Sequence, residues 1–180
     1  MKTTFACVLS TLLASTLFAI PSKSELIYKG TREFGLSGTA ESESIDGSVF
    51  ELDATLGQFI LDYLEVGTVI GLGTSDTISQ FRLGLFTEYN FEIQRTVLPY
   101  TGLSINFLAV DVEERGPGSP KGSETAASFG LELGLKSFWS ENVAVFGAVF
   151  TEWATEEVFI SGNNVQDTNT GLRWGLRFFF

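Results

Sequence analysis

A two-residue alternation of apolar and polar side chains runs through this chain from about position 30 to its end. The closing segment GLRWGLRFFF shows it best, with apolar side chains at even positions and glycine or arginine at odd positions up to Arg177. Successive side chains of a β-strand point to opposite faces, so such a segment has one apolar and one polar face. The pattern therefore predicts an all-β chain built from amphipathic strands.

Eight segments have this alternation or a similarly β-prone composition: 34–40, 50–57, 64–73, 81–89, 101–107, 127–136, 142–152 and 171–180. Each has roughly the ten-residue length of a tilted transmembrane strand. The segment 142–152 is apolar at both parities, so its two faces stay unassigned. Polar loops at 41–47, 74–79, 110–124 and 154–167 alternate with aromatic turns at 58–63, 90–98 and 138–142. This order predicts an eight-stranded antiparallel up-and-down barrel with both ends on the turn side.

Alternation alone leaves open which face of the barrel is buried. A secreted lipocalin also has eight strands, and its apolar face lines a cavity. Here the polar face is rich in glycine, which suits the crowded interior of a small membrane barrel. The chain also ends on three phenylalanines. These features favour an apolar face turned toward lipid.

Aromatic residues gather near the expected strand ends, as in the two interfacial girdles of membrane barrels. On the loop side they are Phe50, Phe81, Phe107 and Trp153. On the turn side they are Phe34, Phe59, Tyr63, Tyr89, Phe91, Tyr100, Phe138, Trp139 and Phe178.

The N-terminus has the pattern of a secretory signal peptide. Lys2 precedes an uncharged apolar run from Phe5 to Ile20, and small residues follow. The run is short for a spanning helix of ~20 residues, which disfavours the alternative of an uncleaved anchor. We expect a signal peptide over residues 1–19, cleavage between residues 19 and 24, and a barrel domain over 25–180.

Composition excludes several kinds of chemistry. The chain has 22 acidic and 11 basic residues, a net charge of -11, which is a poor match to nucleic acid. It has no histidine, and its single cysteine, Cys7, lies in the expected signal peptide. The usual general base of hydrolytic barrel enzymes is therefore missing, and transition metals lack their preferred ligands. We expect no enzymatic activity, no cofactor and no metal site, although the acidic loops leave open bridging by divalent cations to lipopolysaccharide phosphates.

With these residues in view, the whole expected mature chain resembles small outer-membrane barrels of the OmpA/OmpX type. The closing GLRWGLRFFF resembles the C-terminal strand that the family's assembly machinery reads, with Trp174, Phe178 and Phe180 as its aromatic positions. The segment LGQFILDYLEVGTVIGLG resembles the family's second hairpin. The resemblance implies the fold, the bacterial outer membrane as location, and the barrel-assembly machinery and periplasmic chaperones as partners. It does not imply one activity, because the family includes adhesins, structural proteins, channels and enzymes.

The polar face of the expected strands predicts a charge network inside the lumen. Its members are Glu51, Asp53, Glu65, Arg82, Glu88, Glu132, Lys136, Arg173 and Arg177. Unpaired buried charge is costly, so these groups are expected to pair across the barrel. Eight strands leave an interior just wide enough for side chains to fill it, which favours a filled lumen over a charged constriction.

Two functions remain open. The first is a structural or surface-interaction barrel with a filled lumen and four acidic extracellular loops, embedded as a monomer among outer-membrane lipid and lipopolysaccharide. The second is a small, porin-like channel for ions or solutes. A lumen lined by one sign of charge would indicate a channel, and the mixed signs here favour the first.

The barrel prediction is testable on a gel. The refolded mature chain should insert into detergent micelles or vesicles and migrate differently before and after boiling, because a closed barrel resists detergent unfolding at room temperature. A chain that stays soluble without lipid or detergent would instead support the lipocalin.

Overall fold

The computed structural model describes residues 27–44, 47–74, 78–93, 97–112, 122–161 and 164–180. The predicted signal peptide and its cleavage positions lie outside these residues and stay predictions. Among the described residues no helix is long and apolar enough to cross a membrane. The strands are β1 (Arg32–Ser44), β2 (Gly47–Leu61), β3 (Leu64–Thr74), β4 (Ile78–Asn90), β5 (Val97–Val112), β6 (Gly122–Phe138), β7 (Val143–Ala154), β8 (Phe159–Ser161), β9 (Asn164–Gln166) and β10 (Thr168–Phe179).

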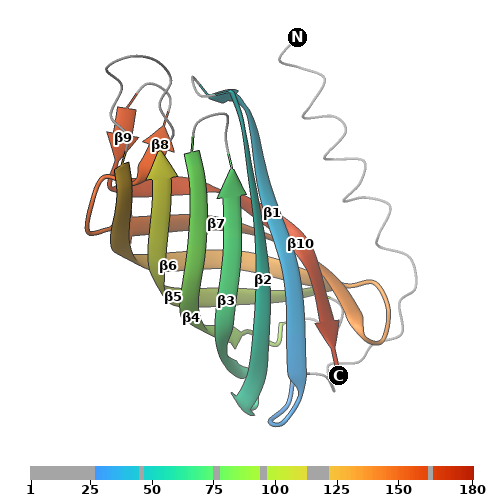
Figure 1. Cartoon of the computed structure of the whole chain (residues 1–180). Coiled ribbons are helices and arrows are strands. Elements are labelled where there is room, and N and C mark those ends of the chain that lie inside the picture. Colours follow the sequence, from blue (N-terminus) through green and yellow to red (C-terminus); the bar gives the residue numbers. More distant parts are fainter. Residues whose placement is uncertain (1–26, 45–46, 75–77, 94–96, 113–121, 162–163) are drawn as a thin grey trace.

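Eight of these strands form one closed barrel in the order β1-β10-β7-β6-β5-β4-β3-β2, with every neighbouring pair antiparallel (Figure 1). The predicted eight-stranded up-and-down barrel is thereby confirmed. β8 and β9 form a separate small hairpin within the connection from β7 to β10.

The strands extend further than their alternating segments. Pairing of β1 with β2 continues to Ser44 opposite Gly47, so most of the predicted loop 41–47 is strand. β2 likewise reaches Leu61, which shortens the predicted turn 58–63. Backbone pairing does not require an apolar side chain, so the ladders continue where the alternation fades. The tight turn places Tyr63 at a φ of 69°, a left-handed conformation that is uncommon for a residue with a side chain.

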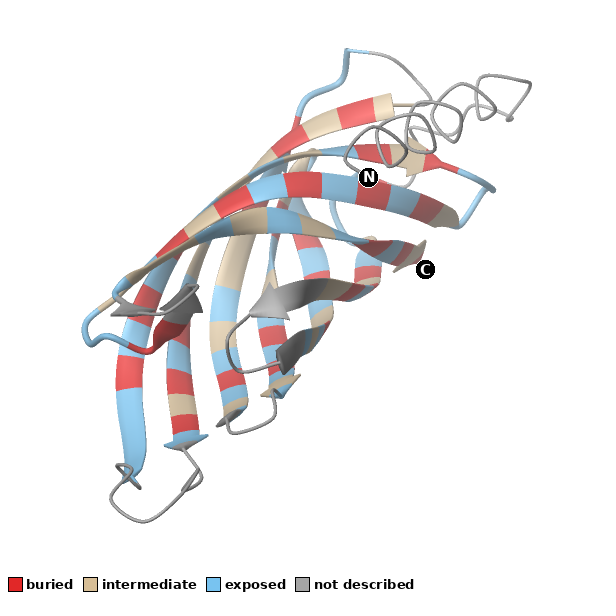
Figure 2. Ribbon diagram, turned by 90° about the horizontal axis from the view of Figure 1, so that it is seen from above, coloured by how far each residue is buried: buried red, intermediate tan, exposed pale blue. Residues whose placement is uncertain are grey.

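The two faces of the barrel wall differ in polarity as the alternation predicts. Bands of buried and exposed residues alternate along several strands in Figure 2. The exposed positions hold large apolar side chains such as Leu85, Ile105 and Leu133. The buried positions include charged groups such as Asp53, Arg82 and Lys136. The wall is therefore apolar outside and polar inside, the reverse of a soluble barrel.

β7 settles the faces of the segment that the sequence left unassigned. Its burial alternates strictly from Ala144 to Trp153. Ala144, Phe146, Ala148, Phe150 and Glu152 point inward, whereas Val145, Val149 and Trp153 point outward. This strand is apolar on both sides because it lines both lipid and an aromatic part of the lumen.

Three aromatic residues assigned to the turn-side girdle lie inside the barrel instead. Phe59, Tyr100 and Phe138 are each at most 3% exposed. Each shares its parity with a charged or polar inward residue of the same strand, and parity decides the direction of a side chain in a strand. Tyr89, Phe91 and Trp139 are exposed, as a girdle requires.

The facing of β7 gives a direct test. Val149, 54% exposed on the outer face, should not tolerate arginine. We expect Val149→Arg to lower the free energy of unfolding by about 2–4 kcal/mol, the cost of a cation on the lipid face near the bilayer midplane. Equilibrium urea unfolding from phospholipid vesicles measures it. Glu156→Arg, at an exposed position beyond the end of β7, is the control and should change little. Equal effects from the two variants would contradict the assigned face.

Candidate functional site: the charged lumen

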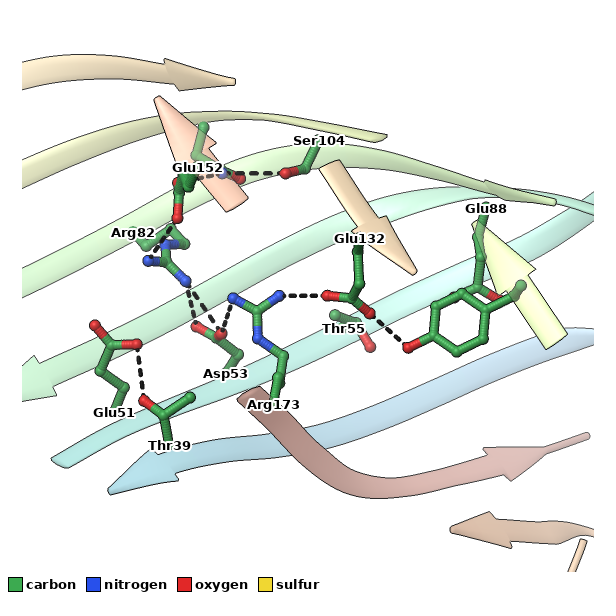
Figure 3. A network of polar contacts seen from close by, with 12 residues as sticks. Thr39, Glu51, Asp53, Thr55, Arg82, Glu88, Ser104, Glu132, Glu152 and Arg173 are labelled. Atoms are coloured by element: carbon green, nitrogen blue, oxygen red, sulfur yellow. Dashed lines mark hydrogen bonds and ion pairs between the residues drawn. The ribbon is translucent and has the colours of Figure 1, made fainter. Parts of the chain in front are cut away.

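Five charged side chains from five strands meet in the loop-side part of the lumen (Figure 3). We call Asp53, Arg82, Glu132, Glu152 and Arg173 the loop-side cluster. Arg82 bridges two acids, with Nη1 3.1 Å from Asp53 Oδ2 and Nη2 3.2 Å from Glu152 Oε2. Arg173 bridges the other way, with Nη1 2.8 Å from Glu132 Oε2 and Nη2 3.5 Å from Asp53 Oδ2. Asp53 therefore joins the two arginines into one network.

Neutral polar groups extend this network. The Asn106 amide donates to Glu152 Oε1 over 2.9 Å, and the Ser128 hydroxyl donates to the same oxygen. The Tyr100 hydroxyl donates to Glu132 Oε1 over 2.5 Å. The carboxylates thus gain hydrogen bonds beyond their ion pairs, which a buried charge needs in order to be tolerated.

A second cluster fills the turn-side part of the lumen. This turn-side cluster consists of Glu33, Glu65, Glu88, Lys136 and Arg177, all buried. Lys136 Nζ lies 2.8 Å from Glu33 Oε2 and 3.8 Å from Glu65 Oε2, and it also contacts Glu88. Arg177 Nη1 lies 3.0 Å from Glu33 Oε1, and its guanidinium stacks 4.2 Å from the ring centre of Phe146.

The three carboxylates of this cluster each place an oxygen within 4.8 Å of the other two, a spacing that suits a metal ion. The Lys136 ammonium, however, contacts all three of them. The cluster is therefore built around a cation that the chain itself supplies. Each cluster has three acids and two bases, so each carries one formal negative charge in excess.

Apolar side chains close the barrel at its turn-side end. Ile27, Phe59, Leu98, Phe138, Ala144 and Phe179 pack together there, and we call them the turn-side seal. Ile27 precedes β1 and is fixed beneath the barrel, because its carbonyl accepts a hydrogen bond of 2.8 Å from the amide of Tyr63. At this end the Tyr63 hydroxyl donates to Glu92, which raises the pKa of Tyr63 because the bond favours the protonated form.

A second apolar cluster packs on the inner side of the barrel near its loop-side end. Leu108 and Val110 of β5 and Ala126 of β6 pack against Val158 and Phe159 from the β7–β10 connection. We call these five residues the loop-side seal. Between the two ends lies a cavity of about 60 Å³ whose lining includes Glu88, Glu132 and Arg177. A space of this size holds a few water molecules at most.

The structure gathers eight of the nine predicted lumen charges into these two clusters. Glu51 is the exception, because it is only partly buried and accepts a hydrogen bond from Thr39 over 3.1 Å. Sequence reasoning missed Glu33, Glu152 and Tyr100. Glu33 is next to Phe34 and Glu152 is next to Trp153, and both aromatic residues were assigned to the outer girdles. Because neighbouring residues of a strand point to opposite faces, parity alone would have predicted that both acids point inward.

Of the three aromatic positions of the predicted assembly signal, Trp174 and Phe178 lie on the outer face of β10, and Phe180 directly follows this strand. Trp174 and Phe180 are exposed and Phe178 is partly buried, with its ring 6.3 Å from that of Phe34. None of them contributes to the lumen clusters.

Solved structures with the same fold are outer-membrane barrels. Neisserial surface protein A matches with a TM-score of 0.61 at 20% identity, over 84% of this chain and 98% of that one. The N-terminal barrel domain of Pseudomonas aeruginosa OprF matches with a TM-score of 0.62 at 14% identity, over 85% and 98%. Pseudomonas aeruginosa OprG matches with a TM-score of 0.56 at 16% identity, over 85% and 97%. No family model matches the sequence, and a search of curated proteins gives no significant match.

A closed barrel with an apolar exterior and a charged interior is a transmembrane β-barrel, because only a closed sheet pairs its backbone within lipid. Its architecture is that of the small eight-stranded barrels of the OmpA/OmpX type. Together these findings locate the protein in the bacterial outer membrane, surrounded by its lipid and lipopolysaccharide.

The central position of Lys136 predicts opposite effects for two substitutions. Lys136→Met leaves three carboxylates facing one another and should cost about 3–5 kcal/mol of unfolding free energy, the usual cost of breaking a buried ion pair. Glu65→Gln should be neutral or stabilising, because neither Glu65 oxygen accepts a hydrogen bond and the cluster has one acid in excess.

Urea unfolding from vesicles compares the two variants with the wild type. Lys29→Met, which alters an exposed lysine outside the barrel, is the matched control. A Lys136→Met protein as stable as this control would mean that the cluster does not need its ammonium group.

Proposed function

We propose that this protein is a structural or surface-interaction barrel of the outer membrane whose lumen is filled and does not conduct. The proposal rests on how much of the interior side chains occupy. From the turn side to the loop side these are the turn-side seal, the turn-side cluster and the loop-side cluster, and they leave a cavity of about 60 Å³.

Mixed charge supports this reading against a channel. A selective pore needs one sign of charge or a ring of dipoles along a water-filled path. Here each interior cation contacts at least two carboxylates, so the charges neutralise one another rather than attract a passing ion. The cavity is the single feature that favours the alternative, a small ion or solute channel, and it is closed toward the turn side by six packed apolar residues.

The loop-side rim supplies the contact surface in this proposal. Its described acids include Asp111, Glu124, Glu156, Glu157 and Asp167, all exposed. An acidic rim suits basic partners, or lipopolysaccharide phosphates bridged by divalent cations. Delivery to the membrane is proposed to use periplasmic chaperones and the barrel-assembly machinery, with Trp174, Phe178 and Phe180 as the assembly signal. The protein is proposed to act as a monomer, without nucleic acid, cofactor or catalytic chemistry.

Single-channel recording tests the filled lumen. The refolded mature protein, with insertion checked by heat-modifiable migration, should give no discrete current steps in a planar bilayer. Reproducible steps would overturn the proposal and favour the channel. In that case Arg173→Ala would identify the path, since it removes a charge from the loop-side cluster and should change the unit conductance. Glu51→Gln, outside both clusters, is the control for a general change of charge.

A further inference from the structure

One residue of the turn-side seal does not belong to a strand. The other members of the seal lie on strands of the barrel wall, whereas Ile27 comes from the segment before β1. The Ile27 side chain is fully buried, while residues 28–30 are exposed. We call residues 27–31 the N-terminal strap. This strap runs along the outside of the turn-side end of the barrel and inserts one apolar side chain into it.

The N-terminal strap is held by the end of one hairpin, that of β2 and β3. The hydrogen bonds between them run from Tyr63 N to Ile27 O, from Gly30 N to Phe59 O and from Phe59 N to Thr31 O, over 2.8, 2.8 and 2.9 Å, and from Lys29 N to Asp62 Oδ1 over 3.0 Å. The ladders of the barrel wall run the length of their strands and have neighbours on both sides. A segment with few hydrogen bonds to one turn opens at a lower free energy than such ladders do.

A tight turn directs Ile27 into the seal. The amide of Thr31 donates to the Tyr28 carbonyl over 3.1 Å, and Gly30, the third residue of this turn, has a φ of 100°. A type II turn requires a left-handed conformation at its third residue, which glycine adopts without strain. A Cβ added at Gly30 would have no atom within 4 Å. A methyl group at this position would therefore strain the turn without touching the barrel.

We propose that the N-terminal strap is a plug that opens and closes the turn-side end of the lumen, with Ile27 as its stopper and the turn at Gly30 as its hinge. Ile27 can leave the seal without breaking any ladder of the barrel. Its departure gives solvent on the turn side access to Leu98, whose ladder partner is Lys136 of the turn-side cluster. The loop-side cluster stays in place, so the open form admits solvent from one end only. This inference goes beyond the proposed function, because it concerns access to the lumen and not passage through it.

Amide hydrogen exchange of the refolded protein in micelles measures release of the strap. The Tyr63 amide donates to Ile27, so it exchanges when the strap leaves. Gly30→Ala should speed this exchange about 5- to 30-fold, because a Cβ in the left-handed conformation disfavours the closed form by that factor. Gly147→Ala is the matched control, since Gly147 is exposed on β7, has no positive φ and also leaves room for a Cβ. Equal exchange of the Tyr63 amide in the two variants would overturn the hinge.

A buried cysteine measures access to the lumen. Cys7 is the only native cysteine, so Leu98→Cys with Cys7→Ser leaves one thiol, placed in the seal. Heat-modifiable migration shows that each variant folds. A charged, water-soluble thiol reagent should label this cysteine about 5- to 30-fold faster with Gly30→Ala than with Gly147→Ala, the same ratio as for the Tyr63 amide.

Equal labelling in the two backgrounds would overturn the plug, because the strap would then move without closing the lumen. Labelling that is as fast without either glycine substitution as with Gly30→Ala would overturn it too, because the strap would not be seated in the native protein. Neither rate depends on conductance, so single-channel recording of the wild type decides the filled lumen separately.

Discussion

Lipid offers no hydrogen bonds, and the whole architecture depends on that constraint. A sheet in the membrane must pair every backbone group within itself, so it must close, and closure with eight strands leaves a narrow interior. The side chains on the inner face then have no solvent of their own. They must satisfy one another, which explains why inward-pointing charges on β1, β2, β3, β4, β6, β7 and β10 combine into two compact networks.

The two networks sit at different depths and differ in how strongly they are enclosed. The turn-side cluster is organised around one lysine and lies against an apolar seal, so its carboxylates are almost fully removed from water. The loop-side cluster is organised around two arginines and is more exposed at Glu132 and Arg173. The charged groups at the turn-side end of the lumen are therefore more fully shielded from solvent than those at the loop-side end.

Much of the fold follows from the alternation in the sequence. The closing strand, where arginine and glycine alternate with leucine and tryptophan, assigns both faces of β10 without ambiguity, and the structure follows it. The two faces of β7 could not be told apart from the sequence, because its inner face is also apolar. Phe146 and Phe150 lie on that inner face and stack on arginine side chains in the lumen. The positions of Phe59 and Phe138 were predicted wrongly because nearness to a strand end was given more weight than parity.

The candidate site was less accessible to sequence reasoning. Parity identifies which charges point inward, but not which of them meet, because partners such as Lys136 and Glu33 are 103 residues apart and come together only through the stagger of the strands. Nor does composition show the turn-side seal, since Ile27 lies before the first strand and gives no periodic signal.

The glycines of the inner wall have a consequence for how sequences with this fold diverge. The Glu65 carboxylate fills the space that a Gly57 side chain would need, and the ring of Tyr100 does the same at Gly134. An inner position therefore changes safely only when its neighbour across the ladder changes size in compensation, whereas an outer position needs only to remain apolar. Divergent relatives should retain little identity on the lipid face, while their interior substitutions should occur as matched large and small pairs along adjacent strands.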